Sequence, residues 1–456
     1  MSRRNNSQRT LDNHLTLHGW LNDHFGYKTT RELLTDVARL DEGFSPDGHS
    51  PICEFLMSLP DLKYGIGDTL PMYDANIKKH LSAINNKRTQ PIVLRYFQYL
   101  ALLYTEIFLD WKFKRPGEFL RQLNDFVQTR NNSRAPGDVM DTRFSEADVE
   151  KLAFWMATGA GKTLIMHINY HQFLHYCKDE ETLDHIILIT PNEGLSEQHI
   201  SELANSDIWC ERFKVEGNRL ASTHNAVQVI EITKLVEEKT GGGLSVPVEA
   251  FEGNNLIFVD EGHKGSGGKV WRTYREALAE TGFTFEYSAT FGQALAAANN
   301  ADLIEEYGKA IAFDYSYRYF YEDGYGKNFR VLNVRHDEES QTEILLLANL
   351  LSFYEQRCYF KQERDAVRDY GLDSPLWAFV GSKVNAVYTE NRRSRSDVLN
   401  VIRFLHRFLK NEENWATDTI EKILNGDSGL SDDGTDVFHN RLNYLRNLSE
   451  TPAQIY

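Results

Sequence analysis

The chain has 456 residues, 41% of them apolar and 12% aromatic, which allows two or three domains with sizeable cores and excludes a chain that is disordered overall. Acidic residues number 66 against 50 lysines and arginines, and the net charge of −16 argues against a basic protein that coats nucleic acid, while still allowing a local basic track. Its four cysteines, Cys53, Cys177, Cys210 and Cys358, are scattered without a Cys-x-x-Cys pair, so neither a disulfide framework nor a zinc site is expected, and this usage is typical of the reducing cytoplasm.

The first 90 residues have a mainly helical pattern, with breaks at residues 43–48 and 59–61, and they carry no motif that assigns a role. Pro91 is followed by an apolar run, Ile92–Trp111, which predicts a long helix. No run approaches the roughly 18 apolar residues of a membrane span, so no membrane partner is expected.

From about residue 150 to 313, strand-like apolar runs alternate with helical patterns, which predicts a parallel α/β domain. The strands are expected to end at five positions: Trp155, Ile189, Ile232, Val259 and Tyr287. We therefore predict three regions: a helical region over residues 1–90, a domain over 91–313 that contains these strands, and a further region over 314–456.

The first of these strands runs into a turn of small residues that predicts a phosphate-binding loop, formed by Thr158, Gly159, Ala160, Gly161, Lys162 and Thr163. Glycines let backbone N–H groups come close to an anion, and the N-terminus of the helix that follows adds positive potential. Lys162 is expected to reach the β- and γ-phosphates of ATP, and the Thr163 hydroxyl to ligate Mg²⁺. Met156 stands where the generic loop has a glycine.

A pair of carboxylates follows a second apolar run about a hundred residues later. Leu256–Val259 has the pattern of a buried parallel strand and ends in Asp260 and Glu261. At the carboxyl end of such a strand, Asp260 can hold Mg²⁺ opposite the phosphate loop. Glu261 can orient or deprotonate the attacking water, so these carboxylates and Lys162 are the predicted catalytic residues.

These motifs resemble those of superfamily 2 helicases, which use an Ala-Thr-Gly-x-Gly-Lys-Thr variant of the phosphate loop. Three further segments fit the same family in the same order: Leu94–Gln98, Ile186–Asn192 and Tyr287–Thr290. The phosphate loop, the Asp-Glu-Gly-His box at 260–263 and the Ser-Ala-Thr segment most resemble the motor subunits of type III restriction enzymes and their phage-defence relatives. The resemblance covers roughly residues 91–390 and implies a first RecA-like, ATP-binding domain over 91–313, followed by a linker and an incomplete second RecA-like domain over 314–456.

The resemblance implies roles for individual residues. Thr190-Pro191 would hold a nucleic-acid phosphate, and Gln98 would read the adenine of ATP. Ser288 and Thr290 would couple hydrolysis to domain movement, and His263 would link the ATP site to the partner domain. After the Asp-Glu box, Lys264 and Lys269 flank a glycine run and either touch a phosphate backbone or belong to a simple exit loop.

The last part of the chain is harder to assign. The tyrosine-rich segment Tyr315–Tyr321 alternates as a strand would, and Leu376–Ser382 resembles the opening strand of a second RecA-like domain. The family's late Gln-x-x-Gly-Arg-x-x-Arg motif has no match after residue 381. A cluster without a framing glycine is read as a solvated loop rather than an arginine finger: Arg392, Arg393 and Arg395. We expect the N-terminal part of a longer motor, or a truncated product, with slow hydrolysis and no translocation by this chain alone.

Behind the phosphate loop, His167, His171 and His175 share one helical face, a spacing that is compatible with zinc. No glutamate follows the first histidine in the pattern of a zinc enzyme, and a partly buried polar stripe is the favoured interpretation. No structural metal is predicted.

The sequence thus predicts an ATP-dependent DNA helicase or translocase of restriction or phage-defence type, in the cytoplasm, with ATP and Mg²⁺ as cofactors. The implied partners are double-stranded DNA and either a modification or nuclease subunit or a missing C-terminal part. One alternative is an ATP-binding switch or assembly subunit that does not move on DNA. A metabolic P-loop enzyme such as a nucleotide kinase is disfavoured by the Thr-Pro turn and the Ser-Ala-Thr segment.

Overall fold

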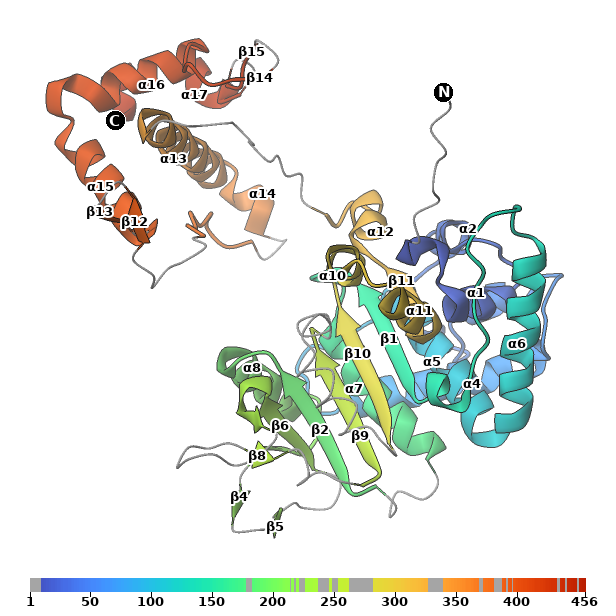
Figure 1. The fold of residues 1–456 in the computed structure, drawn as a ribbon. Helices are drawn as coiled ribbons and strands as arrows, with labels where there is room; N and C mark the ends of the chain where they lie inside the picture. The colour runs from blue at the N-terminus through green and yellow to red at the C-terminus, as the bar shows by residue number, and fades with distance from the viewer. Residues whose placement is uncertain are drawn as a thin grey trace. The chain divides into compact units, whose positions relative to one another are not determined.

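The computed structural model describes residues 10–177, 183–213, 215–216, 219–220, 226–236, 246–247, 253–261, 282–326, 339–368, 372–380, 388–390, 393–395, 397–432, 435–438, 441–448 and 451–456. The chain divides into two compact units, residues 1–327 and 328–456 (Figure 1). The first unit contains a seven-stranded parallel sheet with helices, which confirms the predicted α/β class and the RecA-like, P-loop type of fold. No helix within these described ranges is long and apolar enough to cross a membrane.

The sheet of the first unit has the strand order β11-β1-β10-β9-β2-β6-β3, and every neighbouring pair is parallel. The strands are β1 (Lys151–Met156), β2 (His185–Thr190), β3 (Cys210–Arg212), β6 (Val227–Glu231), β9 (Asn255–Asp260), β10 (Phe283–Ser288) and β11 (Ile311–Tyr315). Five of them end within one residue of the predicted position, because continuous apolar runs mark strands that are buried on both faces. Short strands outside this sheet are β4 (Val215–Glu216), β5 (Arg219–Leu220), β7 (Leu235–Val236) and β8 (Val246–Pro247).

Alternate residues of β1 supply both faces of the sheet. Leu152 and Phe154 belong to the large core shared with the N-terminal helices and with α7 (Lys162–Tyr176). Ala153 and Trp155 belong to a smaller core on the other side, formed with α10 (Phe291–Ala298) and α11 (Ala301–Ala310). Further helices among the described residues of this region are α8 (Glu193–Asn205), η4 (Ile232–Lys234) and α12 (Tyr317–Glu322).

The helical region that precedes the sheet packs into the same core. It comprises η1 (Leu11–Asn13), α1 (Thr16–Asp23), α2 (Thr30–Val37), α3 (Pro51–Met57), α4 (Ile66–Asn85), α5 (Tyr96–Lys114), α6 (Pro116–Asn132) and η2 (Glu146–Val149). Every residue of α5 from Tyr96 to Trp111 is buried, so this helix is surrounded on all sides. It contacts α4, α6, α7 and β11, and thereby joins the N-terminal helices to the sheet.

The second unit is built mainly from helices: α13 (Glu339–Gln362), α14 (Arg364–Arg368), α15 (Asp397–Lys410), η6 (Glu412–Asn414), α16 (Trp415–Asn425), α17 (Asn443–Asn447) and α18 (Pro452–Ile455). They enclose a separate apolar core that includes Leu347, Phe404 and Ile420. Two antiparallel strand pairs are described here, β12 (Tyr388–Glu390) with β13 (Arg393–Arg395) and β14 (Ser431–Asp432) with β15 (Thr435–Asp436).

Three sequence expectations differ from the structure. The long helix begins at Tyr96 rather than Ile92, because the Gln98 side chain accepts a hydrogen bond from the Arg95 backbone N–H and fixes the first turn there. The segment Tyr315–Tyr321 is not a strand: β11 ends at Tyr315 and α12 follows, with Tyr319 buried. The preceding turn is held by the Ser316 N–H, which donates to the Asp314 carboxylate.

The strand expected at Leu376–Ser382 is not formed over its described part, because residues 372–380 have no regular secondary structure. Leu376 and Val380 are 88% and 97% exposed, whereas Trp377 stacks on Phe353 with ring centroids 6.0 Å apart. One aromatic anchor therefore holds this segment instead of strand pairing. Ser382 and Arg392 lie outside the described residues, and Arg393 and Arg395 lie on β13, where their side chains are not described.

Candidate ATP-binding site

The phosphate loop connects β1 to α7 at the carboxyl edge of the sheet. Gly159 and Gly161 both have a φ of +88°, a left-handed backbone that favours glycine and turns the chain sharply before the helix. The loop is fastened at its start, where the Ala157 N–H donates to the Tyr315 carbonyl of β11 at 2.9 Å. Lys162 and Thr163 form the first turn of α7, where unsatisfied N–H groups and the helix dipole attract anions.

Lys162 faces the two carboxylates that end β9. Burial lowers the pKa of its ammonium group, and the negative charges of Glu261 and Asp260 oppose that shift. The phosphate loop and this pair of carboxylates are about a hundred residues apart in the sequence, but in the sheet a single strand, β10, separates β9 from β1. Phosphate-binding cation and metal-binding carboxylate are thus brought to one edge, which is where open α/β sheets bind their ligands.

Asp260 is held ionised by a residue that the sequence did not single out. His199 on α8 donates a hydrogen bond from Nε2 to Asp260 Oδ2 at 3.0 Å, and its side chain is almost fully buried. Burial opposes ionisation of Asp260, but the hydrogen bond and charge of His199 and the charge of Lys162 outweigh it and keep the pKa of this carboxyl below its ordinary value. A buried anion that is held in this way is suited to ligating a divalent cation.

Glu261 has an unusual backbone. Its φ is +55°, a left-handed conformation that non-glycine residues rarely adopt, and its N–H donates to Asp260 Oδ1 at 3.0 Å. Such strain is found where the surrounding structure forces a side chain into a functional direction. Here the left-handed residue Glu261 turns the chain directly after β9, and the carboxylates of Asp260 and Glu261 both remain at the carboxyl edge of the sheet.

Gln98 reaches the phosphate loop from α5. Its side-chain Nε2 donates to the Ala160 carbonyl at 3.1 Å, while its Oε1 accepts from the Arg95 N–H at 3.0 Å. A Cβ added to Gly161 would lie 2.4 Å from Gln98 Nε2, so the glycine is needed for this close approach. The structure places Gln98 beside the loop despite about sixty intervening residues, and its role toward adenine stays a prediction.

Residues 119–293 match the family model described as type III restriction enzyme, res subunit. This segment is therefore similar to a helicase-like ATPase domain of restriction type, and the match runs from within α6 to within α10. No curated protein matches the chain.

The Ser-Ala-Thr segment lies within the matched residues, at the end of β10, the strand next to the one that carries the phosphate loop. Ser288 ends β10 opposite Trp155 of β1, and its Oγ accepts a hydrogen bond from the Thr290 N–H at 3.0 Å. The Trp155 indole donates to the Ala289 carbonyl at 3.2 Å. The segment is therefore fixed to the strand that carries the loop, which is compatible with the coupling role expected of Ser288 and Thr290.

Thr190-Pro191 also lies at this edge, at the end of β2. The Thr190 hydroxyl is buried and contacts the Ser196 hydroxyl at 2.6 Å, so its hydrogen bonding is satisfied inside the protein. The exposed residues of the turn are the next three, Asn192–Gly194. A nucleic-acid phosphate at this turn would contact those residues rather than the Thr190 hydroxyl. His263, Lys264 and Lys269 lie outside the described residues.

The histidines of α7 form the partly buried polar stripe that the sequence favoured. His167 is buried and bonds to the Ser206 hydroxyl at 2.8 Å, His171 is intermediate and His175 is exposed. Burial lowers the pKa of His167 to about 3, which keeps this imidazole neutral. Within the described part of the chain, the one group of side chains with metal-ligand geometry lies elsewhere.

A second buried carboxylate, Glu106 of α5, lies beneath the stripe. It accepts hydrogen bonds from Asn76 at 2.9 Å, Gln172 at 2.7 Å and Tyr176 at 2.7 Å. Burial raises the pKa of Glu106 to about 7, against the lowering effect of these bonds. Gln172 continues the network to Asn169, which accepts from the Tyr287 hydroxyl beside the Ser-Ala-Thr segment at 2.7 Å.

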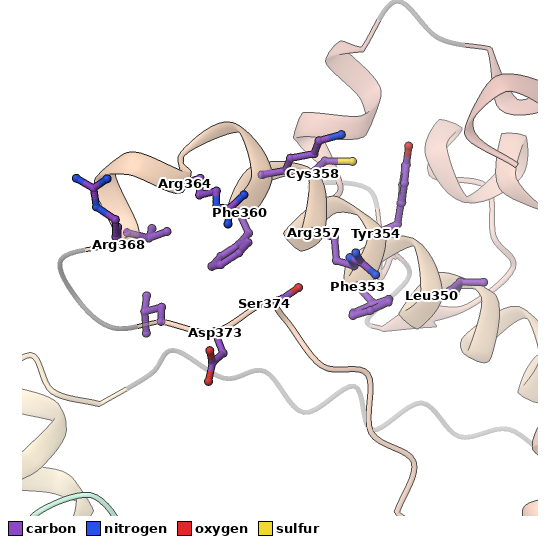
Figure 2. Close-up of a pocket in the computed structure, with 13 residues that line it drawn as sticks. Leu350, Phe353, Tyr354, Arg357, Cys358, Phe360, Arg364, Arg368, Asp373 and Ser374 are labelled. Atoms are coloured by element: carbon purple, nitrogen blue, oxygen red, sulfur yellow. The ribbon is translucent and has the colours of Figure 1, made fainter.

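The second unit has an open pocket of about 940 Å³ along α13 and α14. Four basic side chains form a basic face along it: Arg357 and Lys361, one turn apart on α13, and Arg364 and Arg368, one turn apart on α14. Aromatic side chains lie beside them, and the Arg357 guanidinium is 5.9 Å from the centre of the Phe353 ring (Figure 2). In a chain of net charge −16, this is a local concentration of positive charge.

Proposed function

We propose that this chain is an ATP-driven DNA translocase of restriction or phage-defence type that acts in the cytoplasm with Mg·ATP. The observation that carries the proposal is the convergence of Lys162 with Asp260 and Glu261 at the carboxyl edge of the sheet. A helicase-like ATPase domain of restriction type supplies the reaction class, and the arrangement of these three side chains supplies the chemistry of hydrolysis.

Each residue has a distinct task in this proposal. Lys162 neutralises phosphate charge, and an arriving phosphate anion would favour its charged form against the burial that now lowers its pKa. Thr163 and Asp260 would hold Mg²⁺, with His199 as a positioning residue for the Asp260 carboxylate. Glu261 would take the proton of the attacking water.

Contact with DNA would be local, because the overall charge repels a polyanion. The exposed turn after β2 and the basic face of α13 and α14 are the two candidate phosphate contacts. Alanine at both Arg357 and Arg364 should flatten the dependence of DNA affinity on salt by about 0.7–0.9 in the log–log slope for each phosphate contact that is lost. An unchanged slope would mean that the basic face of α13 and α14 does not contact DNA phosphates.

The alternative is a nucleotide-dependent switch or assembly subunit that binds ATP without moving on DNA. It is favoured by the second unit, whose described residues form helices and antiparallel strand pairs instead of the parallel strands of a second motor domain. DNA-stimulated turnover separates the two functions.

The experiment measures ATP hydrolysis by the purified chain with and without linear duplex DNA, together with displacement of a third strand from that duplex. Because slow hydrolysis and no movement are expected of this chain alone, the same assays are repeated with an added modification or nuclease subunit of a restriction system. A translocase requires stimulated turnover and displacement in at least the second set, and both should disappear in Lys162→Ala. Tight Mg·ATP binding without stimulated turnover in either set would establish the switch instead.

A further inference from the structure

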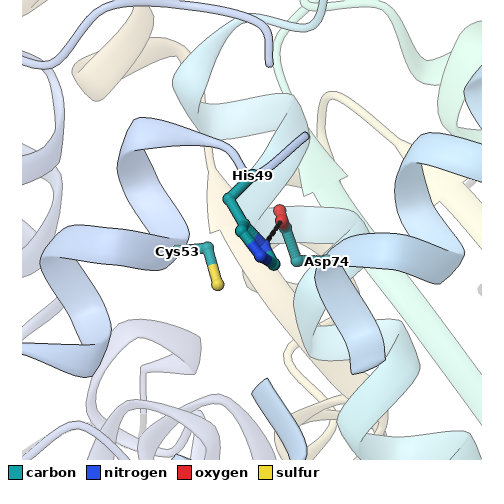
Figure 3. A group of neighbouring side chains, drawn as sticks. All are labelled: His49, Cys53 and Asp74. Carbon is teal, nitrogen blue, oxygen red and sulfur yellow. Dashed lines mark hydrogen bonds and ion pairs between the residues drawn. The ribbon is translucent and has the colours of Figure 1, made fainter. Parts of the chain in front are cut away.

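Three side chains with metal-binding atoms meet in the N-terminal helical region, outside the segment that matches the res-subunit family. They are His49, Cys53 and Asp74, and one ligand atom of each lies within 4.8 Å of the others. Figure 3 shows the His49 ring between the Cys53 sulfur and the Asp74 carboxylate. Cys53 and Asp74 are fully buried, whereas the His49 side chain is 47% exposed and gives access from solvent.

Local structure holds these atoms in place. The backbone of His49 is fixed by a turn in which the Ser45 N–H donates to its carbonyl at 2.8 Å. Ser50 caps α3 by accepting from the Cys53 N–H at 3.0 Å, which orients the helix that carries the thiol. Asp74, in the third turn of α4, is approached from the loop side by both His49 and the Ser50 N–H.

The Asp74 carboxylate is positioned on its other oxygen as well. Tyr99 of α5 donates its hydroxyl to Asp74 Oδ1 at 2.6 Å, which leaves Oδ2 facing His49 and Ser50. His49 Nδ1 and Asp74 Oδ2 are 3.1 Å apart. Two ligands of a tetrahedral ion with bonds of about 2.1 Å lie about 3.4 Å from each other, so the pair already has nearly the separation that an ion requires.

We propose that His49, Cys53 and Asp74 form a zinc site with three protein ligands and a fourth position for water. Thiolate and imidazole select zinc and related transition metals over Mg²⁺ or Ca²⁺, which prefer oxygen ligands alone. On binding, the Cys53 thiol loses its proton to solvent and the sulfur becomes a ligand. The ion would neutralise the buried carboxylate and fasten α3 to α4.

Two other interpretations account for less of the geometry. A simple His49–Asp74 ion pair leaves the convergence of the buried thiol unexplained. A nucleophilic cysteine with a histidine base needs a thiol that a substrate can reach, and Cys53 has no exposed surface. A small ion can enter beside the exposed imidazole, which a substrate cannot do.

The site would also act on the ATP-binding edge through α5. Tyr99, which orients Asp74, is the neighbour of Gln98, which contacts the phosphate loop. Zinc would therefore stabilise the helix that presents Gln98. This consequence is independent of whether the chain moves on DNA.

The test uses the full chain, reconstituted with zinc chloride, freed of loose metal by gel filtration and analysed for zinc by mass spectrometry. We expect one retained zinc per chain in the wild type and an affinity lower by at least about 10–100-fold in His49→Ala, since even changes outside the ligand shell have effects of that size. His49→Ala removes a half-exposed side chain and should fold normally. His406→Ala, an exposed histidine of the second unit, is its matched control.

Cobalt gives a second readout that identifies the sulfur ligand. The cobalt-loaded wild type should have a thiolate-to-cobalt charge-transfer absorption that Cys53→Ser lacks and that Cys177→Ser, at the other buried cysteine, retains. A wild type without retained zinc overturns the proposal, and so does His49→Ala with the zinc content of the wild type. Because neither readout involves ATP or DNA, failure here is distinct from failure of the proposed motor function.

Discussion

Two carboxylates of the first unit have pKa values that are shifted in opposite directions. Asp260, at the edge of the sheet, faces Lys162 and accepts a hydrogen bond from His199, and its pKa lies below the ordinary value. Glu106, inside the helical layer, is surrounded by uncharged donors, and burial raises its pKa to about 7. Burial alone does not decide the charge of a carboxylate, because cationic neighbours decide it at the edge and their absence decides it in the interior.

The contrast separates two kinds of polar structure. The edge concentrates charge that a phosphate and a metal ion can use, and it includes the strained backbone of Glu261. The interior centre joins α4, α5 and α7 through hydrogen bonds and connects to Tyr287 by way of Asn169. Substitutions at the edge should therefore change ATP chemistry, and substitutions in the interior should change stability.

The largest effect is expected from Glu261→Gln. The amide keeps the size of the side chain but cannot take a proton from water, so the hydrolysis rate should fall by about 10²–10⁴ while ATP affinity stays unchanged. Steady-state turnover and calorimetric titration of Mg·ATP measure the two quantities. Glu118→Gln, at an exposed position of α6, should leave both quantities unchanged. Near-normal turnover in Glu261→Gln would mean that Glu261 does not take the proton of the attacking water.

The next effect concerns pH and the interior centre. Because the folded-state pKa of Glu106 is raised to about 7, the folded unit binds more protons than the unfolded chain between about pH 4.5 and 7. Stability from this group is present at the acid end and is lost as the pH rises through 7, by about 3 kcal/mol. Urea denaturation across this range should show that loss in the wild type and lack it in Glu106→Gln.

Glu106→Gln also replaces an acceptor with an amide that cannot accept all three hydrogen bonds, so a constant loss of stability is expected at every pH. The comparison therefore rests on the slope with pH and not on the absolute free energy of unfolding. Equal slopes in the two proteins would mean that Glu106 is ionised in the folded state, like Asp260.

Lys162→Ala should weaken Mg·ATP binding by about 1.5–3 kcal/mol, or roughly 10- to 150-fold, because one charge-assisted contact to phosphate is removed. The substitution also removes an ammonium group whose charged form is disfavoured by burial, so the free energy of unfolding of the unit should stay close to that of the wild type. Isothermal titration measures the first quantity and urea denaturation the second. Lys28→Ala, on the exposed surface, is the control, and equal ATP affinity in the two variants would exclude the loop as the phosphate site.

The smallest effect is expected from Gly161→Ala. A left-handed residue with a Cβ loses about 1–2 kcal/mol, and the added carbon would also press on Gln98. Adding Gln98→Ala should remove the contact but not the backbone strain, so the double variant should recover only part of the free energy of unfolding. Gly117→Ala, where a Cβ meets open space at the start of α6, is the control and should not destabilise. Full recovery in the double variant would assign the whole effect to Gln98.

The parts of the fold that could be predicted are those with a strong local signal. Continuous apolar runs such as Leu256–Val259 fixed the strands to within one residue, since a strand buried on both faces cannot be interrupted by charge. Glycines followed by a lysine at the start of a helix marked the phosphate loop, because a sharp turn and an anion site need these residues locally. The strand predicted over Tyr315–Tyr321 was wrong, because the spacing of its aromatic residues fits both the two-residue period of a strand and the 3.6-residue period of a helix. The turn at Ser316 ends the strand and lets α12 begin.

The rest depended on contacts between distant residues. His199 carries no motif, and it reaches Asp260, 61 residues away, because α8 packs on β2, β3 and β6 of the same sheet. Glu106 lies in an apolar helix, where its network with Asn76 and Gln172 cannot be read from spacing. The meeting of His49 with Asp74 is of the same kind, because the turn at Ser45 and the packing of α3 on α4 determine it.

The order of strands has a consequence for synthesis on the ribosome. The phosphate loop follows β1, yet both neighbours of β1 in the sheet, β10 and β11, come more than a hundred residues later in the chain. The hydrogen bond from the Ala157 N–H to the Tyr315 carbonyl can form only after β11 is made. At about 5–20 residues per second, roughly 7–26 s pass between the synthesis of β1 and that of β10, its first partner in the chain, and β1 is unpaired until then. During that interval the strand is exposed to wrong pairing, and a chaperone that shields β1 would have its greatest effect there.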